Sequence, residues 1–137
     1  MIYNIENNDI FAKLDKEEEV FASIEKIAEI YKIKGAIIVS GIGMLKNFEI
    51  GYFNGTDYIK EKYEKNHELI SFHGTIAATD PKLHIHVALA GPDHRLIGGH
   101  LFSGTVDPLL ELYIVKTEET VFKREYNKKS GLKELNF

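Results

Sequence analysis

From Gly35 onward, the sequence consists of short runs rich in β-branched and aromatic residues, and turn residues separate these runs. The run Ala36–Ser40 is apolar up to its last residue, a pattern typical of a buried central strand. Further strands are expected over residues 10–14, 48–53, 58–63, 68–77, 82–90, 96–102, 106–115 and 120–126. Asn54-Gly55 predicts a two-residue hairpin turn, because both residues tolerate positive φ. Short connections between so many strands predict a largely antiparallel sheet.

One segment before these strands has the pattern of a helix. Asp15, with Glu18 three residues later, predicts an N-cap and a capping box. The apolar residues that follow recur at helical spacing, and they are Val20, Phe21, Ile24, Ile27, Ala28 and Tyr31. Gly35 is expected to end this helix. The predicted fold class is therefore α+β, with a central, largely antiparallel β-sheet and one main amphipathic helix packed on it.

The length of 137 residues predicts a single domain over residues 1–137. Because the chain has no cysteine, disulfides, thiolate zinc sites and cysteine nucleophiles are excluded. No apolar run approaches the ~18 residues that a transmembrane helix needs. The first residues also lack the basic-then-apolar order of a secretion signal. We therefore expect a cytoplasmic protein without a membrane partner.

The charge balance bears on nucleic-acid binding. The 17 basic residues are outnumbered by 21 acidic ones, which gives a net charge of −4 and a pI near 5.9. Arg95 and Arg124 are the only arginines, whereas nucleic-acid-binding proteins usually present a dense basic face. One basic cluster, residues 123–129, contains an acidic residue and is interpreted as a solvated terminal segment rather than a phosphate-binding site.

The histidines give the clearest pattern for a functional site. His84 and His86 are two residues apart, so on a strand they point to the same face, roughly 6–7 Å from each other. His100 follows beyond a Gly-Pro-Asp turn. In an antiparallel hairpin the position numbers of opposed residues have a constant sum. If the turn is centred on Asp93, that sum is 186, which places His86 opposite His100 and all three rings on one face.

Such a trio could bind a metal ion. An odd position sum would turn His100 to the opposite face. With an even sum, three imidazoles supply three ligands of a tetrahedral zinc site and leave the fourth position open. Gly98-Gly99 supports this interpretation, because paired glycines let the backbone approach a crowded centre. A structural cluster of hydrogen-bonded rings is the alternative that the spacing leaves open.

The remaining histidines, His67, His73 and His94, fit ordinary strand-edge or turn positions, and the sequence assigns no catalytic residue. Two glycines in Ser40-Gly41-Ile42-Gly43 favour a sharp bend or bulge beside the sheet rather than a phosphate-binding loop.

Three motifs follow one another in the second half of the chain: His84-Ile85-His86-Val87-Ala88-Leu89, Asp93-His94-Arg95-Leu96-Ile97 and Gly98-Gly99-His100-Leu101. In this order they resemble the core motif of the PPC (plants and prokaryotes conserved, also called DUF296) domain family, whose members are often labelled PD1-like DNA-binding proteins. The resemblance covers nearly the whole chain. It implies an α+β fold like that of acetolactate decarboxylase and a homotrimeric assembly. In similar prokaryotic members, histidines at positions matching His84, His86 and His100 bind zinc.

This resemblance leaves three functions open. The first is a metal-binding protein that binds a small-molecule ligand or has a regulatory role without catalysis. The second is a zinc-dependent enzyme that acts on a small molecule and resembles acetolactate decarboxylase. If this chain is such an enzyme, its Arg95 would hold a substrate carboxylate, and its Glu111 would serve as a fourth zinc ligand or proton carrier. The third is a DNA-associated regulator. Plant members contact DNA through a separate Arg-Gly-Arg-Pro segment, and its absence here, with the acidic pI, argues against direct DNA binding.

Overall fold

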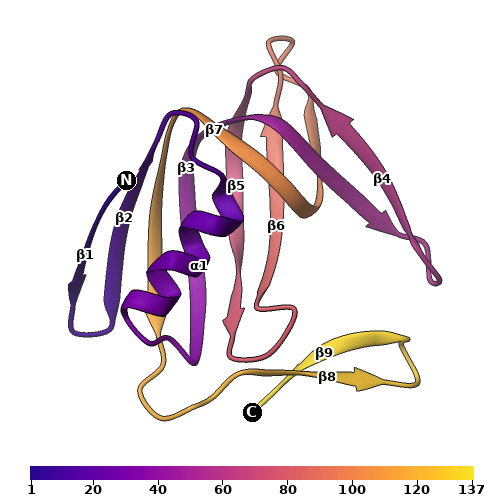
Figure 1. Cartoon of the computed structure of the whole chain (residues 1–137). Coiled ribbons are helices and arrows are strands. Elements are labelled where there is room, and N and C mark those ends of the chain that lie inside the picture. The colour runs from indigo at the N-terminus through magenta and orange to yellow at the C-terminus, as the bar shows by residue number, and fades with distance from the viewer.

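A computed structural model describes residues 1–137 and shows one short helix lying against an array of strands (Figure 1). The elements in chain order are β1 (Ile2–Glu6), β2 (Asp9–Asp15), α1 (Val20–Ile30), β3 (Gly35–Phe53), β4 (Tyr58–Tyr63), β5 (His67–Ala77), β6 (Leu83–Ala90), β7 (Leu96–Lys116), β8 (Lys123–Asn127) and β9 (Leu132–Asn136).

Seven strands form one sheet in the order β1-β2-β7-β6-β5-β3-β4, and β8 and β9 form a separate hairpin. Every pairing is antiparallel. Because β3 also pairs with β7, the strands β3, β5, β6 and β7 close into a hydrogen-bonded ring. The predicted α+β class with a largely antiparallel sheet and one helix is confirmed.

The two longest strands, β3 and β7, each cover two segments that the sequence predicts as separate strands. They remain continuous because bulges take up the irregular residues. The β3–β7 register shifts between Ile38 and Ser40 and again between Gly43 and Leu45. At Gly43 a Cβ would overlap the carbonyl group of Leu109, so only glycine allows the two backbones to approach this closely. The interpretation of this glycine segment as a bend or bulge is confirmed.

The helix α1 packs its apolar side against the sheet (Figure 1). Val20, Ile24 and Ile27 are fully buried and join a single core cluster of 24 buried residues. Burying a side chain of this size stabilises the fold by about 1.5–3 kcal/mol. The helix ends at Ile30, earlier than expected, because Gly35 is already the first residue of β3. No helix in the structure has the length and apolar character that crossing a bilayer requires.

The predicted start of α1 is wrong. Glu19, not Asp15, is the N-cap, and its side chain accepts a hydrogen bond of 2.8 Å from the backbone N–H three residues later. Glu17 has a φ of 69° and donates its N–H to the carbonyl of Val106 in β7. The Glu18 side chain accepts the N–H of Asp15, as a capping box predicts, but backbone pairing with β7 keeps this segment extended.

The predicted two-residue turn at Asn54-Gly55 is also wrong. Phe53 pairs with Tyr58, so four residues connect β3 and β4. The reason is the Asn54 side chain, whose oxygen accepts the N–H groups of both Thr56 and Asp57 at 2.9 Å. Asparagine often stabilises wider loops in this way.

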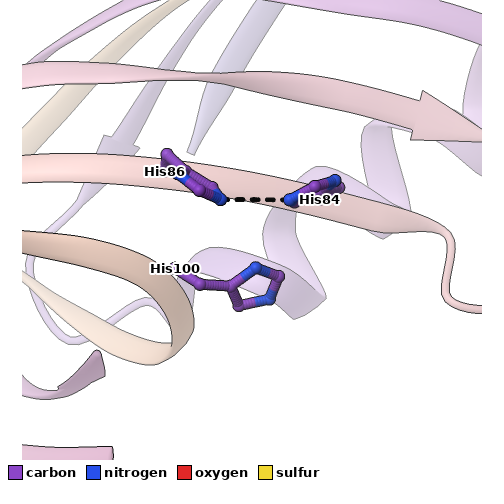
Figure 2. A group of neighbouring side chains, drawn as sticks. All are labelled: His84, His86 and His100. Carbon is purple, nitrogen blue, oxygen red and sulfur yellow. Dashed lines mark hydrogen bonds between the residues drawn. The ribbon is translucent and has the colours of Figure 1, made fainter. Parts of the chain in front are cut away.

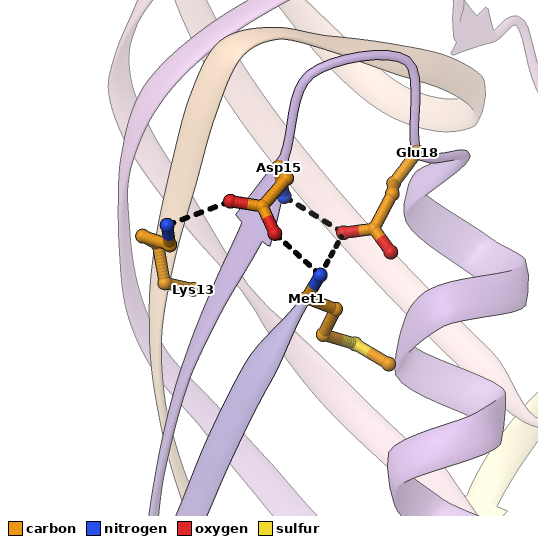
Figure 3. Close-up of polar contacts among 4 residues, drawn as sticks. All are labelled: Met1, Lys13, Asp15 and Glu18. Carbon is orange, nitrogen blue, oxygen red and sulfur yellow. Dashed lines mark hydrogen bonds and ion pairs between the residues drawn. The ribbon is translucent and has the colours of Figure 1, made fainter.

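Ion pairs and hydrogen bonds link the residue before β1 to β2 and to the segment before α1 (Figure 3). The amino group of Met1 contacts Asp15 at 2.5 Å and Glu18 at 3.1 Å. Asp15 also contacts Lys13 at 2.6 Å. The hydrogen bond from Lys13, followed by that from the amino terminus, lowers the pKa of Asp15 to about 2.

Candidate metal centre

The strand β6 has two different faces. Leu83, Ile85 and Val87 are buried in the core. His84 and His86 alternate with them and therefore point to the opposite face. This period of two places both imidazoles side by side on the face of β6 opposite its core residues.

The hairpin from β6 to β7 brings His100 to the same face. Ala90 pairs with Leu96 and His86 pairs with His100, which is the even register with a position sum of 186. The alternative register, in which His100 faces the other way, does not occur. The predicted juxtaposition of the three histidines is therefore present.

The three rings converge on one point (Figure 2). One nitrogen from each of His84, His86 and His100 lies within 4.8 Å of the other two. The Nε2 atoms of His84 and His86 are 3.1 Å apart. Two ligands of a tetrahedral zinc ion, each at 2.0–2.1 Å, are about 3.3 Å from each other. The spacing of His84 and His86 thus fits a shared ion, and a nitrogen of His100 lies within 4.8 Å of both.

His100 has an unusual environment for a structural histidine. Its Nδ1 atom is buried and has no hydrogen-bond partner. The ring packs against Phe102, with centroids 4.6 Å apart, and against Tyr58, at 5.1 Å. A buried polar atom without a partner is rare and needs an explanation, and an ion that completes the site is one. This observation agrees better with a metal ligand than with a hydrogen-bonded cluster.

The electrostatic environment keeps all three rings neutral. Burial is the main cause that lowers the pKa of His84 and of His86 below the ordinary value near 6.5. At His100, burial and then the charges of His84 and His86 lower the pKa to about 4. At neutral pH the ring nitrogens are therefore free of extra protons, which is the state that a metal ion requires.

Glycines allow the strands to come close together around His100. A Cβ at Gly98 would lie 2.6 Å from the carbonyl oxygen of Val87 in β6. A Cβ at Gly99 would lie 2.7 Å from the carbonyl oxygen of Gly51 in β3. Real Cβ atoms essentially never approach this closely. The predicted role of Gly98-Gly99 in close backbone approach is confirmed.

The other histidines lie outside this cluster. The Nδ1 atom of His67 is 2.9 Å from the carbonyl oxygen of Lys65. His73 is opposite His86 on β5, and its Nδ1 atom is 3.0 Å from the hydroxyl of Ser71. His94 is in the β6–β7 turn with a φ of 60°. These positions fit the expected strand end for His67 and turn for His94, but the expectation is wrong for His73, because β5 lies between β6 and β3 inside the sheet.

The structure does not bring Arg95 or Glu111 to the histidines. Arg95 is in the turn, 88% exposed, and its Nε atom is 3.6 Å from Asp93. Arg95 is five positions before His100, which corresponds to about 17 Å along an extended strand. Glu111 is eleven positions further along β7, where it lies opposite Lys13 of β2.

The interpretation of the basic cluster is confirmed for its lysines and wrong for its arginine. Lys123, Lys128 and Lys129 are exposed, but Arg124 is only 7% exposed. Phe122 and Arg124 are two residues apart and both buried, so they face inward together, but no local sequence signal marks the arginine as inward-facing. Arg124 is the residue near the histidines that sequence reasoning missed.

The family follows from comparison with known proteins. The sequence matches the model of the Plants and Prokaryotes Conserved (PCC) domain over residues 4–118. The chain belongs to this family. A comparison with the curated proteins gives no match. The predicted membership of the plants-and-prokaryotes-conserved family is confirmed.

Solved structures show the same PCC fold. A plant- and prokaryote-conserved protein from Pyrococcus horikoshii is 28% identical, with a TM-score of 0.86, over 99% of this chain and 95% of that one. A protein from Archaeoglobus fulgidus, described as metal-containing, is also 28% identical, with a TM-score of 0.87, over 100% and 99% of the two chains. A protein from Bacteroides thetaiotaomicron, provisionally described as DNA-binding, is 21% identical, with a TM-score of 0.88 over 99% and 96%, and shows the fold alone.

Proposed function

We propose that this PCC-domain protein binds one zinc ion through His84, His86 and His100 and acts as a metal-dependent ligand-binding or regulatory protein. The observation that carries the proposal is the convergence of three ring nitrogens within 4.8 Å. The buried, unpartnered Nδ1 atom of His100 supports it. The metal-containing relative from Archaeoglobus fulgidus, 28% identical, is further support.

The donor set fits zinc. Imidazole nitrogens suit zinc among the common divalent ions, and three protein ligands leave a fourth position for water or a ligand. When bound, zinc would act as a Lewis acid toward an oxygen atom at that position. In this chain, β6 and the β6–β7 hairpin fix the three ligands on a rigid sheet, and Tyr58 and Phe102 shield the ring of His100 from solvent.

A zinc-dependent small-molecule enzyme is the second candidate. It is favoured by the same open position, since catalytic zinc sites have three protein ligands whereas structural sites have four. Turnover would require a group that moves a proton beside the metal. Glu111 lies far along β7 and Arg95 is in the turn, so neither is placed beside the histidines for the role that we expected of it.

We further propose that the chain assembles with two copies of itself, as its resemblance to trimeric family members implies. The exposed apolar side chains of Phe11, Ile37, Val39 and Ile42 offer a surface for such contacts. Their exposed fractions are between 47% and 66%. Light scattering of the purified protein should give about three times the chain mass of 15.6 kDa, and a monomer would contradict this proposal.

We expect no direct binding to duplex DNA, because the pI is near 5.9 and Arg124, one of two arginines, is buried. Salt-dependent binding to duplex DNA provides the test. A steep loss of affinity with rising salt, from a sub-micromolar starting value, would overturn this expectation.

Elemental analysis tests the proposed metal site. Purified protein supplied with zinc should retain about one ion per chain, as expected for a single three-histidine site. Alanine at His84, His86 or His100 should remove that ion, whereas His94→Ala should retain it. If the wild type retains no zinc, or if His94→Ala alone loses it, the proposal is wrong.

A further inference from the structure

Arg124 is a buried cation without an anionic partner. It is 7% exposed, and its side chain donates to the hydroxyl of Thr75 at 2.6 Å and to the carbonyl of Pro81 at 3.4 Å. Its backbone N–H donates to the hydroxyl of Thr79 at 2.7 Å. All three acceptors are neutral, and no carboxylate lies within ion-pair distance. Burying a lone charge costs several kcal/mol, so a missing counter-charge is expected nearby.

The guanidinium lies beside the histidines. Thr75, which accepts from Nη2, is directly opposite His84 in the β5–β6 pair, so the two side chains share a face. After burial, the charge of Arg124 is among the causes that lower the pKa of both His84 and His100. The second terminal nitrogen, Nη1, makes no hydrogen bond within the chain. Nη1 is therefore a free donor on the guanidinium group that contacts Thr75, the residue opposite His84.

The other side of the cluster is aromatic and also positively charged. His100 pairs with Gly51 of β3, which in turn pairs with Lys60 of β4, so these positions form one row across three strands. The absence of a side chain at Gly51 makes room for the rings of Phe102 and Tyr58. The Nζ atom of Lys60 is 3.7 Å from the centre of the Phe102 ring.

Positive charge from Arg124 and Lys60 therefore lies on both sides of the histidine cluster. Glu49 is 3.4 Å from Lys60 and balances that charge. Nothing balances Arg124, and three neutral imidazoles would leave the two positive charges of a bound metal ion uncompensated as well. An anion that occupies the open metal position could reach both. The aromatic rings beside His100 favour an anion with a carbon skeleton, since a bare phosphate needs several N–H donors and gains nothing from aromatic contact.

We propose that the histidine cluster binds a small organic acid, whose carboxylate is held by Arg124 beside the metal and whose carbon skeleton packs against Tyr58 and Phe102. This inference rests on the proposed zinc site. It transfers to Arg124 the carboxylate-binding role that the sequence suggested for Arg95. Arg124 is thereby a binding residue, in addition to its contacts that hold β8 on the sheet.

The experiment uses the full chain loaded with cobalt, whose visible absorption reports on ligands at the metal. The probes are isobutyrate, its neutral analogue isobutyramide, and inorganic phosphate. Isobutyrate should change the spectrum of the wild type to saturation, and isobutyramide should not. Phosphate should saturate only at higher concentration than isobutyrate.

Three substitutions separate binding from structure. Arg124→Met should weaken isobutyrate binding about tenfold or more while cobalt remains bound, since a hydrogen bond to a charged group contributes about 1.5–3 kcal/mol. Arg124→Lys should recover part of the affinity. The matched control Thr79→Val removes only the hydrogen bond to the backbone of Arg124 and keeps its guanidinium group, so it should weaken isobutyrate binding less than Arg124→Met does.

The outcomes distinguish this inference from the proposal on which it rests. If the wild type takes up no cobalt, both are wrong. If cobalt binds but isobutyrate and isobutyramide act alike, the inference alone is wrong, and the wild-type measurement decides this even where Arg124→Met does not fold. Tighter binding of phosphate than of isobutyrate, or equal loss of affinity in Thr79→Val and Arg124→Met, would also overturn it.

Discussion

Zinc should raise the melting temperature of the wild type and leave that of His86→Ala unchanged. Zinc at about 100 times its dissociation constant stabilises the folded state by about 2.7 kcal/mol. Unfolding 137 residues at about 2.1 cal/mol/K per residue gives an entropy of about 0.29 kcal/mol/K. The expected increase is therefore about 9 °C. His86 is exposed. Its replacement should therefore change the free energy of unfolding by no more than about 0.5 kcal/mol, which corresponds to a change of less than about 2 °C in the melting temperature.

The matched control is His73→Ala. His73 lies directly opposite His86 on β5 and is also exposed, but it is outside the cluster. Differential scanning calorimetry with zinc and with a chelator should show the full increase for the wild type and for His73→Ala. No increase in the wild type, or the same increase in His86→Ala, would refute the reasoning.

Three further predictions concern the scaffold. Gly99→Ala should lower the free energy of unfolding in urea by about 1–3 kcal/mol, because its Cβ would lie 2.7 Å from the carbonyl oxygen of Gly51 and force β7 away from β3. An unchanged urea midpoint would contradict the close packing. Phe48→Ala should cost about 3–5 kcal/mol in the same assay, since this side chain is 1% exposed in the core, and a cost below 1 kcal/mol would mean that the core is arranged differently. Asp15→Asn should lower the melting temperature near neutral pH and have progressively less effect as the pH falls through 2, because the contact with Lys13 lowers the pKa of Asp15 from 3.8 to about 2. A lowered carboxyl pKa stabilises the fold above about pH 3.8, and this contribution is lost as the pH falls toward 2; a difference that stays constant with pH would argue against the contact.

The metal centre could be predicted because it depends on local rules. The period of two along β6 places His84 and His86 on one face, and the hairpin register places His100 with them. Both rules act within a segment of 17 residues, from position 84 to position 100. Predicting the cluster therefore required no knowledge of contacts between residues far apart in the sequence.

Contacts distant in sequence explain what could not be predicted. The helix α1 begins later than predicted, because the backbone of Glu17 pairs with Val106, 89 positions away. The closed strand ring depends on β3 pairing with β7, whose residues are far apart in the chain. The burial of Arg124 depends on Thr75 and Pro81, 49 and 43 positions away. A charged residue in a basic segment gives no local sign of such partners.

Edge elements were missed for a different reason. Most residues of β1 and β9 are exposed, so neither strand has a clear apolar alternation. Each pairs with only one neighbour, β2 and β8 respectively. Their sequences carry little of the signal on which strand prediction depends.

The most direct test of the central claim is anomalous X-ray scattering at the zinc edge, from crystals grown with zinc and without chelator. We predict one peak for each chain, at about 2.0–2.1 Å from one nitrogen of His84, of His86 and of His100. A map without a peak between these rings, or with the ring of His100 turned away from the other two, would contradict the account.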